Sequence, residues 1–220
     1  MNILVTGAAG YVGSHLIKYL LKKSKNKIYA LDNFSNSGLS VIKKLKEINK
    51  EKLLFKKIDI KEKKKISTFI LENKIDTIIH LAAKIDAFES HHFKKEYELN
   101  NLVASINLIK IASKHKIKKF IFASSAAIYG DVTNCFCSES QIAKPINPYG
   151  KFKYLAEKFI TRKKNLNYTI LRFFNIAGID KDFYPYFYKR RSLFFSIIKH
   201  FYKKKNFFLA NKSSKKNFQE

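Results

Sequence analysis

The chain has 220 residues, enough for one domain and part of a second, and its 46% apolar content permits a sizeable buried core. No run approaches the 18 consecutive apolar residues of a transmembrane helix. The formal net charge of +27 comes from 40 Lys and only 4 Arg, spread along the whole chain. Because base readout and bidentate phosphate contacts favour Arg, we interpret this charge as compositional bias and expect no specific nucleic-acid partner.

The predicted elements alternate between strands and helices. Short apolar runs predict strands at 2–6, 27–31, 52–57, 75–80, 118–123 and 167–172. Apolar residues at helical spacing predict helices at 11–23, 39–49, 62–73, 94–115 and 149–164. This alternation predicts an α/β fold with a doubly wound parallel sheet of the Rossmann-like kind. The long connection 124–148 follows the carboxyl end of a strand, where such sheets bind ligands.

The composition changes after residue 180, where twelve of the last forty residues are aromatic and Lys-rich runs separate them. One helix is predicted at 193–203 and a short strand at 206–209. Taken alone, 181–220 is too small for a second domain.

The first strand leads into a helix through the segment TGAAGYVGSHL, which places Gly7, Gly10 and Gly13 three residues apart. Glycines at this junction permit a tight turn and the close approach of a diphosphate to the N-terminus of the helix. A tight turn without a ligand remains the alternative. Asp32 favours the dinucleotide, because it follows the second strand nineteen residues after Gly13, the distance at which a carboxylate accepts hydrogen bonds from an adenosine ribose. A carboxylate there repels a 2′-phosphate, which favours NAD over NADP.

Asp59 ends the third strand and is a candidate contact for the adenine amino group. A helix N-cap for 62–73 and an ordinary loop carboxylate are the alternatives.

Tyr149 and Lys153 are four residues apart on a predicted helix, so their side chains share one face. A nearby ammonium favours the phenolate of a tyrosine, which then accepts a proton from a substrate hydroxyl. Ser125 ends a predicted strand, where its hydroxyl faces a cofactor and shares a proton with Tyr149. The alternatives are a Tyr–Lys pair that merely decorates the surface and a serine that caps loop backbone. His80 is interpreted as a structural histidine at a strand end.

The N-terminus lacks the cationic start of a signal peptide, and glycines interrupt its apolar stretch. Cys135 and Cys137 are expected to be unpaired thiols in a reducing cytoplasm, and two cysteines do not make a zinc site. We therefore expect a cytoplasmic protein without a metal or a membrane partner.

These segments together resemble the extended short-chain dehydrogenase/reductase family and, within it, the branch of UDP-glucose 4-epimerases. The resemblance covers about residues 1–180 and includes TGAAGYVGSHL, LDNFSNS, DI at 59–60, HLAAKIDAFES, NN at 100–101, SSAAIYG, PYGKFKYLAE and LRFFNIAG. The related nucleotide-sugar 4,6-dehydratases carry an Asp-Glu pair after the catalytic Ser or Thr. Here Ala126 and Ala127 follow Ser125, which disfavours a dehydratase.

The resemblance implies an NAD-binding domain at 1–180 and the incomplete start of a smaller substrate domain at 181–220. It implies cofactor contacts at Gly7, Gly10, Tyr11, Val12, Gly13, Asp32, Asn33, Phe34, Ser35, Asn36, Ser37, Asp59, Ile60, Leu81, Ala82, Ala83, Lys84, Asn100, Tyr149, Lys153 and Phe174. It implies a catalytic group of Tyr149, Lys153 and Ser125, and substrate contacts at Ser125, Tyr149 and Asn175. Lys84 stands one position out of register with the lysine of the family.

The function that the resemblance implies is an NAD-dependent epimerase that interconverts UDP-glucose and UDP-galactose through a 4-keto intermediate. The expected partner is the UDP-sugar, and a homodimer stays open. Another nucleotide-sugar epimerase or reductase, and a remnant that at most binds NAD, are the alternatives. Members of the family continue well beyond the length of this chain, so we expect a truncated form with weak or no activity.

Overall fold

The computed structural model describes residues 1–132, 137–178 and 180–183. The predicted helix at 193–203, the predicted strand at 206–209 and Cys135 lie outside these residues. The chain divides into two units, 1–174 and 175–220, and every helix and strand given below lies in the first.

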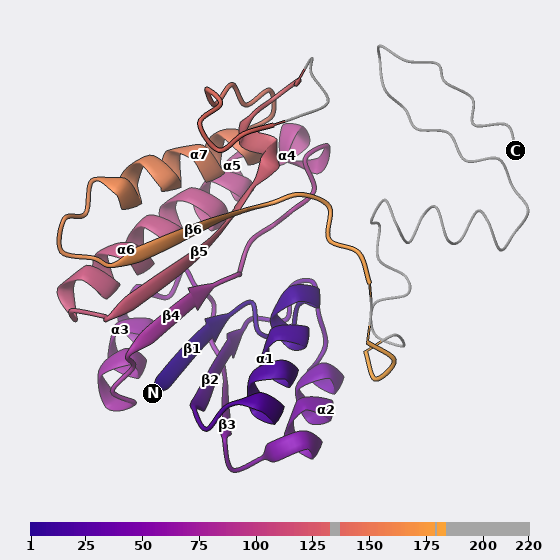
Figure 1. Ribbon diagram of the computed structural model, residues 1–220, viewed down its shortest axis with the longest axis vertical. Coiled ribbons are helices and arrows are strands. Elements are labelled where there is room, and N and C mark those ends of the chain that lie inside the picture. The colour runs from indigo at the N-terminus through magenta and orange to yellow at the C-terminus, as the bar shows by residue number, and fades with distance from the viewer. Residues whose placement is uncertain (133–136, 179, 184–220) are drawn as a thin grey trace, which may run out of the picture. The chain divides into compact units, whose positions relative to one another are not determined.

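Six parallel strands form one sheet in the order β3-β2-β1-β4-β5-β6, as Figure 1 shows. The strands are β1 (Asn2–Thr6), β2 (Lys27–Asp32), β3 (Leu53–Lys57), β4 (Thr77–His80), β5 (Lys119–Ser125) and β6 (Tyr168–Phe173). The strand order reverses between β1 and β4, and the crevice beyond the carboxyl ends at such a reversal is where open α/β sheets bind ligands. The predicted doubly wound sheet is confirmed.

Helices cover both faces of the sheet. They are α1 (Tyr11–Lys23), α2 (Leu39–Asn49), α3 (Lys63–Glu72), α4 (Glu89–His92), α5 (Lys94–Tyr97), the π-helical η1 (Glu98–Val103), α6 (Ala104–Lys114), the 3₁₀ turn η2 (Ala126–Ile128) and α7 (Pro148–Thr161). The helices α1 and α2 pack together, and α3, α6 and α7 pack together on the other face (Figure 1).

The single helix predicted at 94–115 is wrong in one respect, because a π-helical turn interrupts it at η1. Asn101 lies in this turn, and its fully buried side chain clamps the backbone of Lys84. The Lys84 N–H donates to Asn101 Oδ1 at 2.9 Å, and Asn101 Nδ2 donates to the Lys84 carbonyl oxygen at 2.7 Å. Apolar periodicity carries no signal for such a turn, and π-turns are frequent at functional sites.

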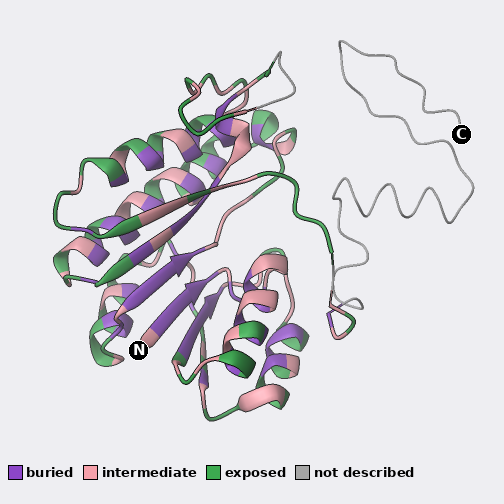
Figure 2. Cartoon of the chain, viewed as in Figure 1, coloured by how far each residue is buried: buried purple, intermediate pink, exposed green. Residues whose placement is uncertain are grey.

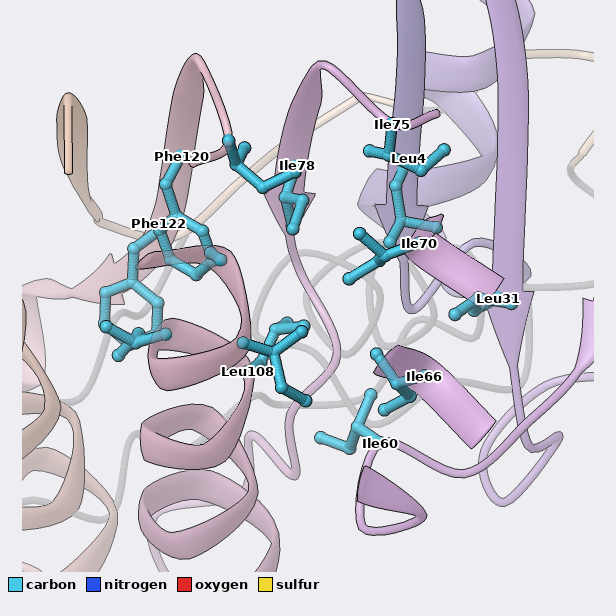
Figure 3. Packing of buried hydrophobic residues seen from close by; sticks show 14 of the residues in the cluster. Leu4, Leu31, Ile60, Ile66, Ile70, Ile75, Ile78, Leu108, Phe120 and Phe122 are labelled. Atoms are coloured by element: carbon cyan, nitrogen blue, oxygen red, sulfur yellow. The ribbon is translucent and has the colours of Figure 1, made fainter. Parts of the chain in front are cut away.

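One hydrophobic cluster of the core lies between the sheet and the layer of α3, α6 and α7, and buried residues of α1 and α2 cover the other face. Figure 2 shows the buried residues concentrated in the central strands. In Figure 3, Ile78 and Phe120 from the strands lie near Leu108 of α6, and Leu4 lies near Ile70 of α3. Full burial of such a side chain contributes about 1.5–3 kcal/mol, so this layer holds the strand ends in fixed positions. Within the described residues, no helix has both the length and the apolar character needed to cross a membrane.

Candidate active site

The turn between β1 and α1 requires two of its three glycines for steric reasons. Gly7 has φ +69°, and a Cβ on it would lie 2.7 Å from the backbone N of Ala82. A Cβ on Gly13 would lie 2.2 Å from the carbonyl oxygen of Gly7. A Cβ on Gly10 would meet only that same oxygen, at 3.2 Å, among the described atoms within 4 Å other than its chain neighbours. Gly7 and Gly13 therefore close the turn, whereas the space over Gly10 is open.

Beyond Gly10 lies the N-terminus of α1, with Tyr11 and Val12 as its first residues. This first turn has no side-chain cap and no acidic residue. The N–H groups of a first helical turn lack intrahelical acceptors, and they point along the positive end of the helix dipole. Together with the open side of Gly10, this end fits a phosphate or diphosphate.

Asp32 is buried at the end of β2 and ties the glycine turn to the loop 33–37. Its Oδ2 accepts the N–H of Ala9 at 2.9 Å. Its Oδ1 accepts the N–H of Phe34 at 2.8 Å and the hydroxyl of Ser37 at 3.2 Å. A carboxylate offers about four acceptor sites, so one site on Oδ2 remains for a ligand hydroxyl. Phe34 adopts a left-handed conformation, with φ 63°, beside this carboxylate.

Asp59 builds the turn before α3 and also contacts the loop after β2. It accepts the N–H of Lys61 at 2.8 Å and the side-chain amide of Asn33 at 2.9 Å. Partial burial raises the pKa of Asp59, but the Lys61 N–H, the Asn33 amide and the Lys61 charge together hold it below the ordinary value. The alternative that Asp59 is the N-cap of the helix is wrong, because Glu62 occupies that position. The side chain of Ile60 belongs to the core, so its backbone is the part available to a ligand.

The segment after β4 lies on the other side of the reversal in strand order, next to the end of β1. The N–H of Ala82 donates to Thr6 Oγ1 at 3.3 Å, which holds 81–83 against the end of β1. The Lys84 ammonium lies 2.9 Å from Glu96 and 5.6 Å from the centre of the Tyr97 ring. The Asn100 side-chain amide donates to Asn101 Oδ1 at 3.1 Å. It therefore helps to orient the Asn101 side chain that binds the backbone of Lys84.

His80 is a buried, neutral structural residue, as predicted. Its Nδ1 lies 2.7 Å from Thr6 Oγ1, and its Nε2 lies 2.9 Å from Ser105 Oγ. Burial, together with the charge of Lys153, lowers the pKa of His80 to about 3. The side chain therefore joins β1, β4 and α6 and does not act as a base near neutral pH.

Tyr149 and Lys153 are both buried, so the interpretation of this pair as surface decoration is wrong. The Ser125 hydroxyl interacts with the Tyr149 side chain and favours the lower pKa of its phenol. That hydroxyl also accepts the N–H of Ala127 at 3.1 Å, so Ser125 caps the turn η2 as well. A Cβ on Gly150 would lie 2.4 Å from the Ala127 carbonyl oxygen, so α7 approaches η2 closely and brings Tyr149 to Ser125.

The electrostatics of this pair differ from the sequence-based expectation. Burial raises the pKa of Tyr149, and the hydrogen bond from Ser125 offsets part of that rise. Lys153 Nζ donates to the Ala123 carbonyl oxygen at 2.7 Å and lies 4.9 Å from the centre of the Phe122 ring. Burial lowers the pKa of Lys153 to about 7, with an opposing contribution from Glu157. Burial therefore dominates the pKa of Tyr149, and the group that opposes burial is the Ser125 hydroxyl, not the Lys153 ammonium as expected from the sequence.

Two groups of side chains around this pair carry no sequence signal of their role. Ser90, fully buried, accepts the N–H of Tyr149 at 3.2 Å and donates to the Ala87 carbonyl oxygen at 2.6 Å. Buried Glu157, one helical turn after Lys153, forms an ion pair with the partly exposed Arg172. Asn147, in contrast, could have been recognised from the sequence, because an Asn followed by Pro is typical of a helix start. Its side chain caps α7 by accepting the N–H of Gly150 at 2.8 Å.

The remaining predicted residues are placed as follows. Phe174 is exposed just after β6, and Asn175 begins the second unit. Ser124, beside Ser125, is the buried side-chain oxygen without a hydrogen-bond partner among the described residues. Over the same residues, no three His, Cys, Asp or Glu side chains gather as metal ligands. The open side of Gly10, the N-terminus of α1, the fixed Asp32 carboxylate and the Ser124 hydroxyl, which has no partner among the described residues, lie along one edge of the sheet and fit a dinucleotide.

Comparison with known proteins points to the same chemistry. The sequence profile of the NAD dependent epimerase/dehydratase family matches residues 3–216. The chain is 38% identical over 196 residues to the UDP-glucose 4-epimerase of Caenorhabditis elegans. The matched region covers 83% of this chain and 56% of that protein. The UDP-Glc/GlcNAc 4-epimerase of Campylobacter jejuni superposes with a TM-score of 0.76 at 33% identity, covering 87% of this chain and 57% of the other.

The UDP-glucose 4-epimerase of Bifidobacterium longum, solved with NAD⁺ and UDP, gives a TM-score of 0.77 at 30% identity and covers 82% of this chain and 55% of the other. The chain thus spans little more than half the length of these three relatives. The family profile nevertheless covers nearly all of it, including the glycine turn and the Tyr149–Lys153 helix. The chain therefore belongs to the NAD dependent epimerase/dehydratase family.

Proposed function

We propose that this chain binds NAD and takes part in the interconversion of UDP-glucose and UDP-galactose through a 4-keto sugar. The observation that carries the proposal is the group of buried Tyr149, buried Lys153 and half-buried Ser125 on the same edge of the sheet as the glycine turn and Asp32. The relatives named UDP-glucose 4-epimerases, and the Bifidobacterium longum structure with NAD⁺ and UDP, support this choice among the activities of the family.

The cofactor would be held by groups that the fold fixes in place. The N–H groups at Tyr11 and Val12 and the open side of Gly10 suit the diphosphate. The remaining acceptor site on Asp32 Oδ2 suits a ribose hydroxyl, and a 2′-phosphate there would meet a carboxylate. When bound, NAD would accept a hydride from the sugar carbon C4 and return it.

The protein groups would move the accompanying proton. Tyr149, in its phenolate form, would accept the proton of the O4 hydroxyl, and the neighbouring Ser125 hydroxyl would share that proton with it. A protonated Lys153 would supply the positive charge that favours the phenolate. The same groups would return the proton when the keto sugar is reduced.

Other assignments belong to the same proposal. Residues 33–37, 59–60, 81–84 and Asn100 would line the cofactor, Phe174 would pack near its nicotinamide, and Asn175 would contact the sugar diphosphate.

A homodimer through the layer of η1, α6 and α7 is proposed because Leu99 and Val103, one turn apart, are about 40–45% exposed. We also propose a reducing, cytoplasmic location, in which Cys137, without a disulfide among the described residues, would stay a thiol.

The test of the activity is direct. The purified chain, loaded with NAD, is incubated with UDP-glucose, and UDP-galactose is followed by the NMR signal of its anomeric proton. We expect at most slow conversion in both directions, toward the same equilibrium ratio, because the chain spans little more than half the length of the epimerases that it resembles. Failure to bind NAD, or reduction of bound NAD by neither sugar nucleotide, would contradict the proposed function.

The cofactor assignment makes a separate prediction about Asp32. NADH is expected to bind more tightly than NADPH, and Asp32→Asn is expected to narrow that difference because it removes the charge that repels a 2′-phosphate. Loss of the charge-assisted hydrogen bond should weaken NADH itself by about 1.5–3 kcal/mol. Titration of the fluorescence of both reduced cofactors measures these affinities. Glu47→Gln, which neutralises an exposed carboxylate on α2, is the control, and equal affinities in the unmodified chain would refute the assignment.

A further inference from the structure

Glu157 is a carboxylate almost fully buried beneath a residue of the proposed catalytic group. It follows Lys153 by four residues on α7, so the two side chains share one face of the helix. Each is only 3% exposed. A buried carboxylate is strongly unfavourable unless it is paired, so its retention here requires partners.

Arg172 of β6 supplies those partners. Its Nε lies 3.2 Å and 3.3 Å from the two oxygens of Glu157, and its Nη2 donates to Oε2 at 2.9 Å. Its Nη1 donates at 2.9 Å to both the Tyr129 hydroxyl and the Glu139 carbonyl oxygen. The guanidinium therefore fixes the carboxylate in one position and joins β6 to the connection that follows β5.

Of the described groups around Lys153 that are considered below, Glu157 is the one that carries a negative charge. On β5, Lys153 meets the Ala123 carbonyl oxygen and the face of Phe122, which carry no net charge. On β4, His80 interacts with it but is neutral near pH 7, since its pKa lies at about 3. On α7, Tyr149 is a neutral phenol at that pH because burial raises its pKa, and on β6, Arg172 is positive.

We propose that Glu157, held by Arg172, is a positioning residue whose carboxylate keeps Lys153 protonated in its buried site. The catalytic meaning of this inference rests on the proposed function, in which the Lys153 ammonium supports the phenolate of Tyr149. The electrostatic claim is a property of the chain itself. It agrees with the opposing effects of burial and Glu157 on the Lys153 pKa, which lies at about 7.

A purely structural ion pair is the competing explanation, in which Glu157 and Arg172 only fasten α7 to β6. Two substitutions separate the explanations, because both break the same pair but change the charge near Lys153 in opposite directions. Glu157→Gln removes a negative charge, which should make Lys153 easier to deprotonate. Arg172→Gln removes a positive charge and leaves the carboxylate, which should make Lys153 harder to deprotonate.

The experiment is an NMR titration of the chain labelled at lysine with ¹³Cε and ¹⁵Nζ, without cofactor or sugar. Lys153 is assigned by its absence in Lys153→Arg, and its position over Phe122 displaces its signal from those of the exposed lysines. We expect the titration midpoint to fall by about 1 pH unit or more in Glu157→Gln and to rise in Arg172→Gln. Glu47→Gln, at an exposed ion pair on α2, should leave it unchanged.

The inference would be overturned if the Lys153 midpoint moved in the same direction in both variants, or if it moved in neither variant. If Glu157→Gln does not fold, the direction in Arg172→Gln decides alone, since an unchanged or lowered midpoint there contradicts the proposal. Because the titration uses no NAD or UDP-sugar, it can fail while the epimerase activity is real, and it can succeed while that activity is absent.

Discussion

Replacing Tyr149 with phenylalanine is expected to lower the rate of interconversion of UDP-glucose and UDP-galactose by about 10²–10⁴-fold, with NADH affinity nearly unchanged. The side chain is 8% exposed and packs with Tyr97 and Phe152, and phenylalanine preserves that packing. The backbone N–H of residue 149 keeps its bond to Ser90 in the variant, so the helix start is also preserved. The loss therefore reports on the hydroxyl alone.

The measurement compares turnover and NADH titration in Tyr149→Phe and Tyr154→Phe. Tyr154 lies on the same helix, half-buried, with the Lys158 ammonium 4.9 Å from the centre of its ring. The same chemical change there should leave turnover unaffected. Retention of more than a tenth of the turnover in Tyr149→Phe would show that another group accepts the proton.

The parts of the fold that follow from the sequence are those with strong local patterns. The segments ILV at 3–5 and II at 78–79 lie in central strands buried on both faces, so they are continuous apolar runs. The glycine turn and Asp32 were predictable because backbone sterics and strand ends dictate residue type at fixed spacings. Tyr149 and Lys153 were placed on one helix face by periodicity.

The features that escaped prediction depend on contacts between distant parts of the chain. Ser90 meets Tyr149 across 59 residues, and nothing in its own segment marks it as a cap for α7. Glu157 reads as an ordinary exposed helix residue until β6 brings Arg172 against it. The pKa of Tyr149 was misjudged for the same reason, because helical spacing gives the neighbouring charge but not the degree of burial that opposes it.

The glycine turn makes the last prediction, in which two chemically identical substitutions should have different effects. In Gly13→Ala, the new Cβ would lie 2.2 Å from the Gly7 oxygen and 3.0 Å from the Ala8 Cα, both backbone atoms that cannot rotate away. Such overpacking costs about 1–3 kcal/mol or more, and each kcal/mol lowers Tm by about 2–4 °C in a chain of this size. We expect a clearly lowered Tm and loss of NADH binding, because the turn also holds Asp32 through Ala9.

Gly10→Ala is the matched control and the sharper test of the cofactor site. Gly10 has φ −71° and ψ 172°, an extended conformation that alanine adopts without strain. The new Cβ would lie 3.2 Å from the Gly7 carbonyl oxygen and within 4 Å of no other described atom outside its chain neighbours. Stability should therefore stay within about 1 kcal/mol of the unmodified chain. NADH should nevertheless bind about tenfold more weakly or worse, since a methyl group would occupy the space that brings a diphosphate to the N–H groups of α1. Thermal unfolding and NADH titration of both variants decide the matter. Undiminished affinity in Gly10→Ala would mean that no diphosphate lies over this turn, and full stability of Gly13→Ala would mean that the turn is looser than its backbone contacts require.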